Sequence, residues 1–178
     1  SDIMKRMILY GSKYGSSRNY AEKLSDQTNI PAFSFEQAPS FKNIDTFIYI
    51  GSLYAGGVLG LSKFIRKIKD DQHLILVTVG LADPTIEENA TNIKNKLRQL
   101  LGSQLFDRSK IFHLRGAINY QQLSFKDRTL MKLLYKSISR KSFDNLTSED
   151  KALVETYNKK VNFIDYDALK VIIEELQA

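Results

Sequence analysis

Short apolar runs alternate with stretches of helical periodicity along the chain, and this alternation constrains the fold more than any other feature. The predicted strands cover residues 7–10, 31–35, 46–50, 74–79 and 110–114. Several of them are hydrophobic at nearly every position, which is typical of strands buried on both faces. Strands that alternate with helices pair in parallel, because each crossover needs the length of a helix. The sequence therefore predicts an α/β fold.

These strands are too few for a (β/α)₈ barrel. We expect a doubly wound, five-stranded parallel sheet of order 2-1-3-4-5, in a single domain over residues 1–178. An extra segment at about 115–143 follows the fifth strand and contains an amphipathic helix. Sheets of this kind bind ligands at the carboxyl ends of the strands, where the strand order reverses. The loops after the first, third and fourth strands are therefore the candidate site.

The first of these loops is rich in glycine and hydroxyl residues. It consists of Ser12, Lys13, Tyr14, Gly15, Ser16 and Ser17. The N–H groups at the start of a helix have no partner inside the helix, and the helix dipole adds positive potential there. Serine hydroxyls add donors, and Gly15 lets the backbone approach a ligand, so the loop predicts a phosphate site. A helix start that is merely capped by Ser16 or Ser17 is the alternative interpretation.

The spacing in this loop excludes other phosphate-binding classes. The patterns G-x-x-x-x-G-K-[ST] and G-x-G-x-x-G are absent, and no acidic residue follows the first strand as it would in a receiver domain. The sequence Ser-x-Tyr-Gly-Ser-Ser resembles the T/S-x-T-G-x-T phosphate loop of flavodoxins, although Tyr14 departs from that pattern. The resemblance implies that FMN is the cofactor and that its phosphate binds at residues 12–17.

The second and third loops extend the resemblance to flavodoxins, which implies that both loops flank the isoalloxazine ring of FMN. Their predicted cofactor-binding residues are Ser52, Leu53, Tyr54, Ala55, Gly56, Gly80, Leu81, Ala82 and Asp83. Tyr54 could stack on the flavin, because an aromatic face suits a flat ring. A surface tyrosine in a glycine-rich turn is the alternative. The sequence assigns no catalytic residue, and His73 and His113 lack neighbours at metal-ligand spacing, so we expect no metal site.

The extra segment carries the positive charge of the chain. The formal net charge is +6, and the excess of basic residues between 115 and 141, where Asp127 is the only acid, equals it. The basic residues are Arg115, Lys126, Arg128, Lys132, Lys136, Arg140 and Lys141. An apolar arc on the other side of the helical wheel holds Leu130, Met131, Leu133, Leu134 and Ile138. Phe125–Lys141 is therefore a basic amphipathic helix that packs on its own domain, lies on an anionic membrane or contacts a partner. We expect no nucleic-acid binding, because no base-reading module is evident.

Two motifs in this segment resemble a narrower family. Gly-Ala-x-x-Tyr at 116–120 and Asp-Arg-x-x-Met-Lys-Leu at 127–133 are similar to the inserted segment of menaquinone-dependent protoporphyrinogen dehydrogenases. Those enzymes are FMN proteins that pass electrons from a porphyrinogen to a membrane quinone. The resemblance implies an FMN-dependent oxidoreductase that passes electrons between a porphyrinogen-like or other small substrate and a quinone. The segment lacks tryptophan, and the second loop departs from the sequence pattern of that family. A relative that acts on another substrate is therefore an alternative.

Two other functional classes stay open. A flavodoxin-type electron carrier without its own substrate is disfavoured by the pI near 9.4, because such carriers are typically acidic. An interaction module without flavin is the other class, since a fold alone does not establish function. The chain has no cysteine, no visible signal peptide and no apolar stretch near the ~20 residues of a membrane span. We therefore expect a cytoplasmic protein, with peripheral contact at the inner face of the membrane through Phe125–Lys141 as one option.

Overall fold

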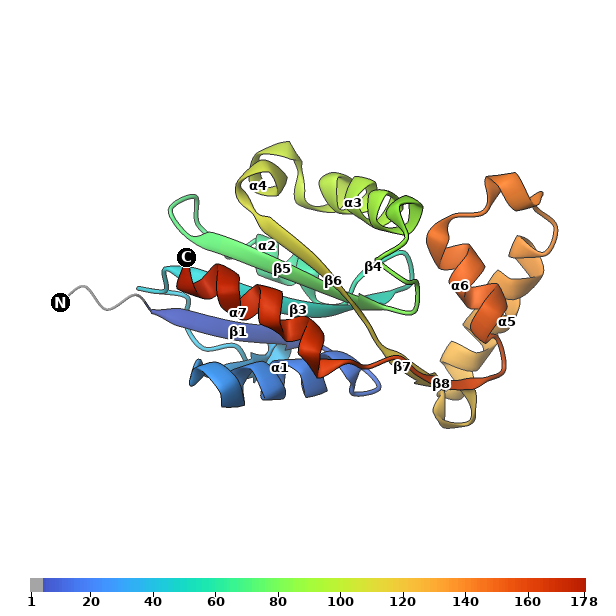
Figure 1. The fold of residues 1–178 in the computed structure, drawn as a ribbon, viewed down its shortest axis with the longest axis horizontal. Helices are drawn as coiled ribbons and strands as arrows, with labels where there is room; N and C mark the ends of the chain where they lie inside the picture. Colours follow the sequence, from blue (N-terminus) through green and yellow to red (C-terminus); the bar gives the residue numbers. More distant parts are fainter. Residues whose placement is uncertain (1–4) are drawn as a thin grey trace.

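The computed structural model describes residues 5–178, so residues 1–4 of the predicted domain lie outside the described residues. Its centre is a parallel sheet of order β2-β1-β3-β5-β6, which confirms the predicted topology (Figure 1). The parallel strands are β1 (Arg6–Gly11), β2 (Ala32–Ser34), β3 (Thr46–Tyr54), β5 (His73–Gly80) and β6 (Lys110–Arg115). A short antiparallel strand, β4 (Gly57–Val58), pairs with the end of β3.

Helices cover both faces of this sheet. One face carries α1 (Ser16–Thr28) and α7 (Lys170–Gln177), and the other carries α2 (Leu61–Ile65), α3 (Glu87–Leu101) and α4 (Ser103–Arg108). Short 3-10 turns, η1 (Phe35–Gln37) and η4 (Tyr166–Leu169), lie in the connections. Successive strand residues point to opposite faces, so Ile48 packs towards α1 while Phe47 and Tyr49 pack towards α2 and α3. This two-sided burial explains the nearly continuous apolar runs in the strands.

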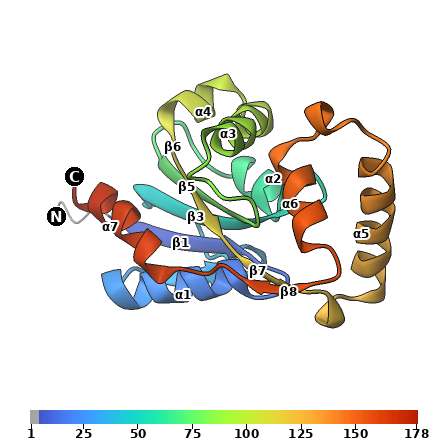
Figure 2. The same cartoon turned by 45° about the vertical axis from the view of Figure 1, so that its right-hand side comes forward.

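Residues 116–162, here called the insert, leave the sheet after β6 and form a separate structure beyond one end of it (Figures 1 and 2). The insert contains β7 (Ala117–Asn119), η2 (Tyr120–Gln122), α5 (Phe125–Ile138), η3 (Phe143–Asn145), α6 (Ser148–Thr156) and β8 (Lys160–Asn162). β7 and β8 pair antiparallel and close the insert. It therefore runs past residue 143, where the sequence suggested that the extra segment ends.

The insert has a small apolar core of its own. The buried residues of this core are Tyr120, Leu123, Ile138 and Leu153, from η2, α5 and α6. A capping box starts α6, because the Thr147 side chain accepts from the Asp150 N–H while the Asp150 carboxylate accepts from the Thr147 N–H. Two ion pairs join α6 to α3, Lys96 with Glu149 at 3.5 Å and Lys151 with Glu88 at 3.4 Å. The insert thus touches the main layers through polar groups.

Candidate functional site

A cavity of about 620 Å³ lies where the parallel strands end, between the sheet and the insert. Ten of the predicted cofactor-binding residues line it: Lys13, Tyr14, Ser16, Ser52, Leu53, Tyr54, Ala55, Gly56, Gly80 and Leu81. The remaining five predicted residues, Ser12, Gly15, Ser17, Ala82 and Asp83, lie outside its lining. All three predicted loops therefore reach one cavity, although each contributes only some of its residues.

The first loop leaves the start of α1 open. Gly15 is the N-cap residue with φ of 102°, a left-handed conformation that favours glycine, and no side chain caps the helix. The Ser16 hydroxyl instead accepts from the Ala117 N–H at 3.0 Å, and the buried Ser17 hydroxyl pairs with the Ser52 hydroxyl at 2.6 Å. The interpretation that Ser16 or Ser17 caps the helix is therefore wrong. The backbone N–H groups of the first turn stay available to an anion.

The second loop is the tip of a β-hairpin. β3 continues to Tyr54, two residues turn the chain, and β4 returns antiparallel. The turn residues Ala55 and Gly56 have φ of 48° and 83°, as the tight turns that match the twist of a hairpin require. Residues 52–54 are thus strand residues and not the loop that the sequence indicated. This strand geometry fixes the Tyr54 side chain at the cavity.

Side chains that do not line the cavity hold the third loop in place. The Arg115 guanidinium donates to the Leu81 carbonyl oxygen at 2.8 Å and lies 3.7 Å from the centre of the Phe163 ring. The Asp83 carboxylate accepts from the N–H and the hydroxyl of Thr85, and these hydrogen bonds lower its pKa. Asp83 therefore organises the chain before α3, while Gly80 and Leu81 face the cavity.

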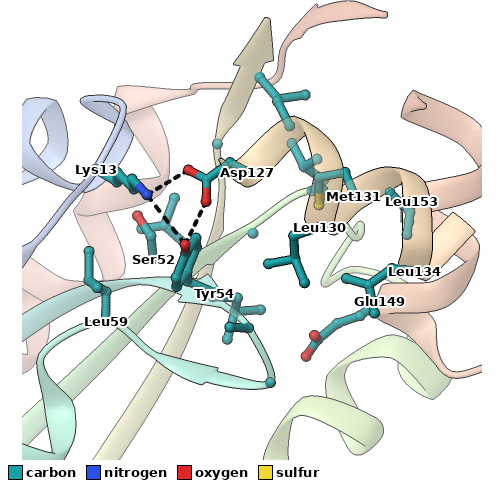
Figure 3. Close-up of a pocket in the computed structure, with 18 of the residues that line it drawn as sticks. Lys13, Ser52, Tyr54, Leu59, Asp127, Leu130, Met131, Leu134, Glu149 and Leu153 are labelled. Carbon is teal, nitrogen blue, oxygen red and sulfur yellow. Dashed lines mark hydrogen bonds and ion pairs between the residues drawn. The ribbon is translucent and has the colours of Figure 1, made fainter. Parts of the chain in front are cut away.

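The insert supplies the opposite wall of the cavity. Its apolar lining residues include Leu123, Leu130, Met131, Leu134, Ile138 and Leu153 (Figure 3). The predicted apolar arc on α5 anticipated most of these, although Leu133 of that arc points to solvent and is 62% exposed. The α6 residues Glu149 and Leu153 were missed, because no local pattern indicates that α6 folds back beside α5.

A polar cluster lies where the insert meets the first and second loops (Figure 3). The Asp127 carboxylate, on the first turn of α5, accepts hydrogen bonds from the hydroxyls of Tyr14 and Tyr54, the latter at 2.6 Å. The Lys13 ammonium lies 2.7 Å from the same carboxylate. Ser124 caps the helix by accepting from the Asp127 N–H at 3.1 Å. The only acid of the basic segment is thus the group that ties the insert to the predicted cofactor loops.

The cluster keeps Asp127 ionised. Burial raises the pKa of this carboxyl, but hydrogen bonds from Lys13, Tyr14 and Tyr54 outweigh burial and hold the pKa well below its usual range. The same hydrogen bonds raise the pKa of the Lys13 ammonium and of the Tyr54 hydroxyl. At neutral pH the cluster therefore pairs one anion with one cation and two neutral hydroxyl donors. Elsewhere in residues 5–178, no group of three His, Cys, Asp or Glu side chains is placed to hold a metal ion.

The sequence profile of the flavodoxin domain family matches residues 7–145. The chain belongs to this family. A solved structure of a protein from Bacteroides uniformis that is classed as a flavoprotein is similar, with 10% identity over 72% of this chain and 98% of that chain and a TM-score of 0.48. A flavodoxin variant from Pseudomonas aeruginosa shares 20% identity over 85% of this chain and 99% of that chain, with a TM-score of 0.38. Both likenesses are too weak to assign a function. A search of curated proteins found no match.

Membership of the flavodoxin domain family makes FMN the cofactor and gives the protein a redox role. The cavity fits that molecule on several counts. The uncapped start of α1 suits a phosphate, and the donors of Lys13, Tyr14 and Tyr54 already hold an anion of the chain itself, the Asp127 carboxylate. The volume of about 620 Å³ lies within the roughly 300–1,000 Å³ of typical cofactor and ligand pockets.

Proposed function

We propose that the protein is an FMN-dependent oxidoreductase that holds a small substrate of its own. FMN would bind with its phosphate at residues 12–17 and its ring between the β3–β4 hairpin and residues 80–83. The supporting observation is the second wall of the cavity: α5 and α6 turn an apolar surface towards the predicted flavin loops. A carrier that only docks on other proteins needs no such chamber beside its flavin.

In this arrangement the chain binds and orients the reacting molecules, and bound FMN supplies the electron transfer. Leu130, Met131 and Leu134 offer an apolar surface that would exclude water and hold a flat, apolar substrate beside the flavin. Tyr54 would contact the ring from the hairpin. The cluster of Lys13 and Asp127 closes the cavity at the end where the phosphate loop lies.

The finer proposal is that electrons pass between a porphyrinogen-like donor and a quinone. Two features support it: the cavity wall is mostly apolar, and Asp127 and Met131 of the motif at 127–133 line it. The family match covers the flavodoxin domain and does not extend to protoporphyrinogen dehydrogenases. The substrate class therefore depends on the motif resemblance and on the lining of the cavity.

We further propose that the insert contacts an anionic membrane that holds the quinone, at its inner face. Three of the large exposed apolar side chains, Phe125, Leu133 and Phe143, are 86%, 62% and 70% exposed, and all lie in the insert. Exposed basic residues accompany them in the same segment: Arg128, Lys132 and Lys136 on α5, and Arg140 just after its end. Exposed apolar and basic side chains together favour an interfacial helix. Within residues 5–178, no helix is both long and apolar enough to cross a membrane.

The cofactor is tested first by the absorbance spectrum of the purified protein with added FMN. Yellow colour and a raised melting temperature are expected, because a ligand that binds only the folded state stabilises it. If saturating FMN changes neither, the interaction module without flavin becomes the better explanation.

The substrate proposal is tested with two adjacent leucines of α5. Leu134 lines the cavity, whereas Leu133 does not. Leu134→Arg should lower the reduction of a soluble quinone by a porphyrinogen or NAD(P)H at least tenfold while FMN affinity stays the same. Leu133→Arg adds the same charge outside the cavity and should leave turnover unchanged. Equal turnover in both variants, or no saturable turnover in the native protein, would favour the electron carrier.

A further inference from the structure

The cluster around Asp127 places a carboxylate against the loop that is proposed to hold a phosphate. Lys13 is the only charged residue among residues 12–17, and its ammonium is 2.7 Å from Asp127. Tyr14, the next residue of that loop, also donates to Asp127. The insert thus places the Asp127 carboxylate against the Lys13 ammonium and the Tyr14 hydroxyl of the loop. These two donors can bind an incoming phosphate only if they divide their hydrogen bonds between the phosphate and Asp127, or if they break their contacts with Asp127.

Asp127 is well suited to act as an internal anion. Its side chain is 4% exposed, and its position on the first turn of α5 is fixed by the Ser124 cap. It has two oxygens, one bound by Tyr54 at 2.6 Å and the other by Lys13 and Tyr14. A second anion that approaches Lys13 would meet a neutralised cation and a carboxylate of like charge.

We propose that Asp127 competes with the FMN phosphate for the Lys13 ammonium and so sets how strongly the site prefers FMN over riboflavin. The inference rests on the proposed placement of the phosphate at residues 12–17. Riboflavin has the same ring and ribityl chain but lacks the phosphate, so Asp127 has no competitor when riboflavin binds. Contacts to the ring affect both ligands equally, whereas the competition affects FMN alone.

The test is a titration of FMN and of riboflavin, followed by flavin fluorescence, against the native protein and Asp127→Asn. Asparagine keeps the shape, and its amide oxygen can accept from one tyrosine hydroxyl while its NH2 group donates to the other, but it cannot neutralise Lys13. FMN should bind about tenfold more tightly to Asp127→Asn, a modest factor because Lys13 is partly exposed to solvent. Riboflavin affinity should stay within about twofold. Weaker binding of both ligands would overturn the inference, since it would make Asp127 merely a structural tie.

A double-mutant cycle with Lys13→Met separates competition for Lys13 from general repulsion. Lys13→Met alone leaves the Asp127 carboxylate without its cation, so its effect on FMN affinity combines lost attraction with added repulsion, and it serves to complete the cycle. In the Asp127→Asn background the same substitution should remove the tenfold gain. A gain that persists without Lys13 would overturn the proposal in favour of simple repulsion between Asp127 and the phosphate.

Asp144→Asn is the matched control, because Asp144 is an exposed acid of the same insert and its replacement changes the net charge equally. It should leave both affinities unchanged. Circular dichroism checks that each variant folds. If Asp127→Asn does not fold, Asp127→Ser takes its place in the cycle, with the same expected gain for FMN alone and the same outcomes that would overturn the inference. Failure of FMN to bind the native protein would instead overturn the cofactor site itself.

Discussion

The two walls of the cavity are held in place by different forces. The sheet wall rests on strands that lie between two helix layers, and side chains such as Ile48, Ile50 and Val77 are wholly buried against α1 and α7. The insert wall rests on a small apolar core, and several of its large side chains, such as Leu134, remain exposed. Stability in a protein follows the local density of buried apolar contacts. The sheet wall is therefore the more firmly fixed of the two, and the insert wall the less firmly fixed.

Polar contacts between the insert and the rest of the protein partly compensate for the small buried apolar surface of the insert. They consist of the Asp127 cluster and of the ion pairs between α3 and α6. The partly exposed ion pairs between α3 and α6 contribute only about 0–1 kcal/mol each, so they position the insert more than they stabilise it. Links of this kind also respond to anions, pH and salt, which gives the insert a sensitivity that the sheet does not have.

The largest expected effect compares one leucine from each region. Leu97 of α3 is 0% exposed, whereas Leu134 of α5 is 40% exposed. Leu97→Ala should lower the free energy of unfolding by about 2–5 kcal/mol, because it leaves a cavity in the core. Leu134→Ala should cost less than about 1 kcal/mol, because little burial is lost. Urea denaturation measures both. Equal losses would mean that the insert and the sheet form one cooperative core.

The next effect concerns the outer surface of the insert. Changing Lys132, Lys136 and Arg140 to Glu should abolish binding to anionic vesicles at low salt, since each basic residue near such a surface contributes about 1 kcal/mol. Co-sedimentation with anionic and with neutral vesicles, at low and at high salt, measures the binding. FMN affinity should not change, because these side chains are exposed and do not line the cavity.

The control for this experiment changes three exposed lysines of the main layers, Lys42, Lys69 and Lys110, to Glu. This variant undergoes the same change in net charge and should still bind anionic vesicles. If both variants lose binding alike, the attraction comes from net charge and not from the insert. If the native protein shows no preference for anionic vesicles, the basic helix has no role at a membrane.

The contrast between the two walls also explains what the sequence could predict. The strands could be located from apolar runs such as 46–50 and 74–79, because a strand buried on both faces has no room for polar residues. Their order, which the structure confirms, was expected from the doubly wound class to which such alternating strands and helices belong. The position of the three loops followed from that order. The hairpin at 52–58 was read as a loop, because a tight turn at Ala55 and Gly56 depends on backbone angles that composition alone does not reveal.

The insert was harder to predict, because its contacts are long-range. The helical spacing of Leu130, Met131 and Leu134 predicted an apolar face, but not that this face lines a cavity. Asp127 was noticed only as a lone acid among basic residues. Its partners Tyr14 and Tyr54 are more than seventy residues away in the sequence. No local pattern contains such a pairing, so only the folded structure brings these groups together.

A smaller effect should appear when the pH is lowered. The pKa of Asp127 lies below its value of about 3.9 in an unfolded chain, so its ionised form stabilises the fold. This contribution is complete above about pH 5 and is lost as the pH falls through the lowered pKa. The native protein should therefore melt above Asp127→Asn at pH 7, and the gap should narrow below about pH 4. A gap that stays constant between pH 7 and pH 3 would show that the charge of Asp127 is not what ties the insert.

The smallest expected effect separates the two roles of Tyr54, which belongs to the sheet wall but donates to the insert. Tyr54→Phe keeps the ring and removes only the hydroxyl, which donates to Asp127 and accepts from Lys13, so it should cost about 1 kcal/mol of stability and leave the flavin spectrum unchanged. Tyr54→Ala also removes the ring. If the ring stacks on the flavin, this variant should regain flavin fluorescence and shift the reduction potentials while it still binds FMN. Both variants lose the hydroxyl, so any spectral difference between them comes from the ring. An unchanged spectrum and unchanged potentials in Tyr54→Ala would place the ring outside the flavin site and leave Tyr54 as a link between the two walls.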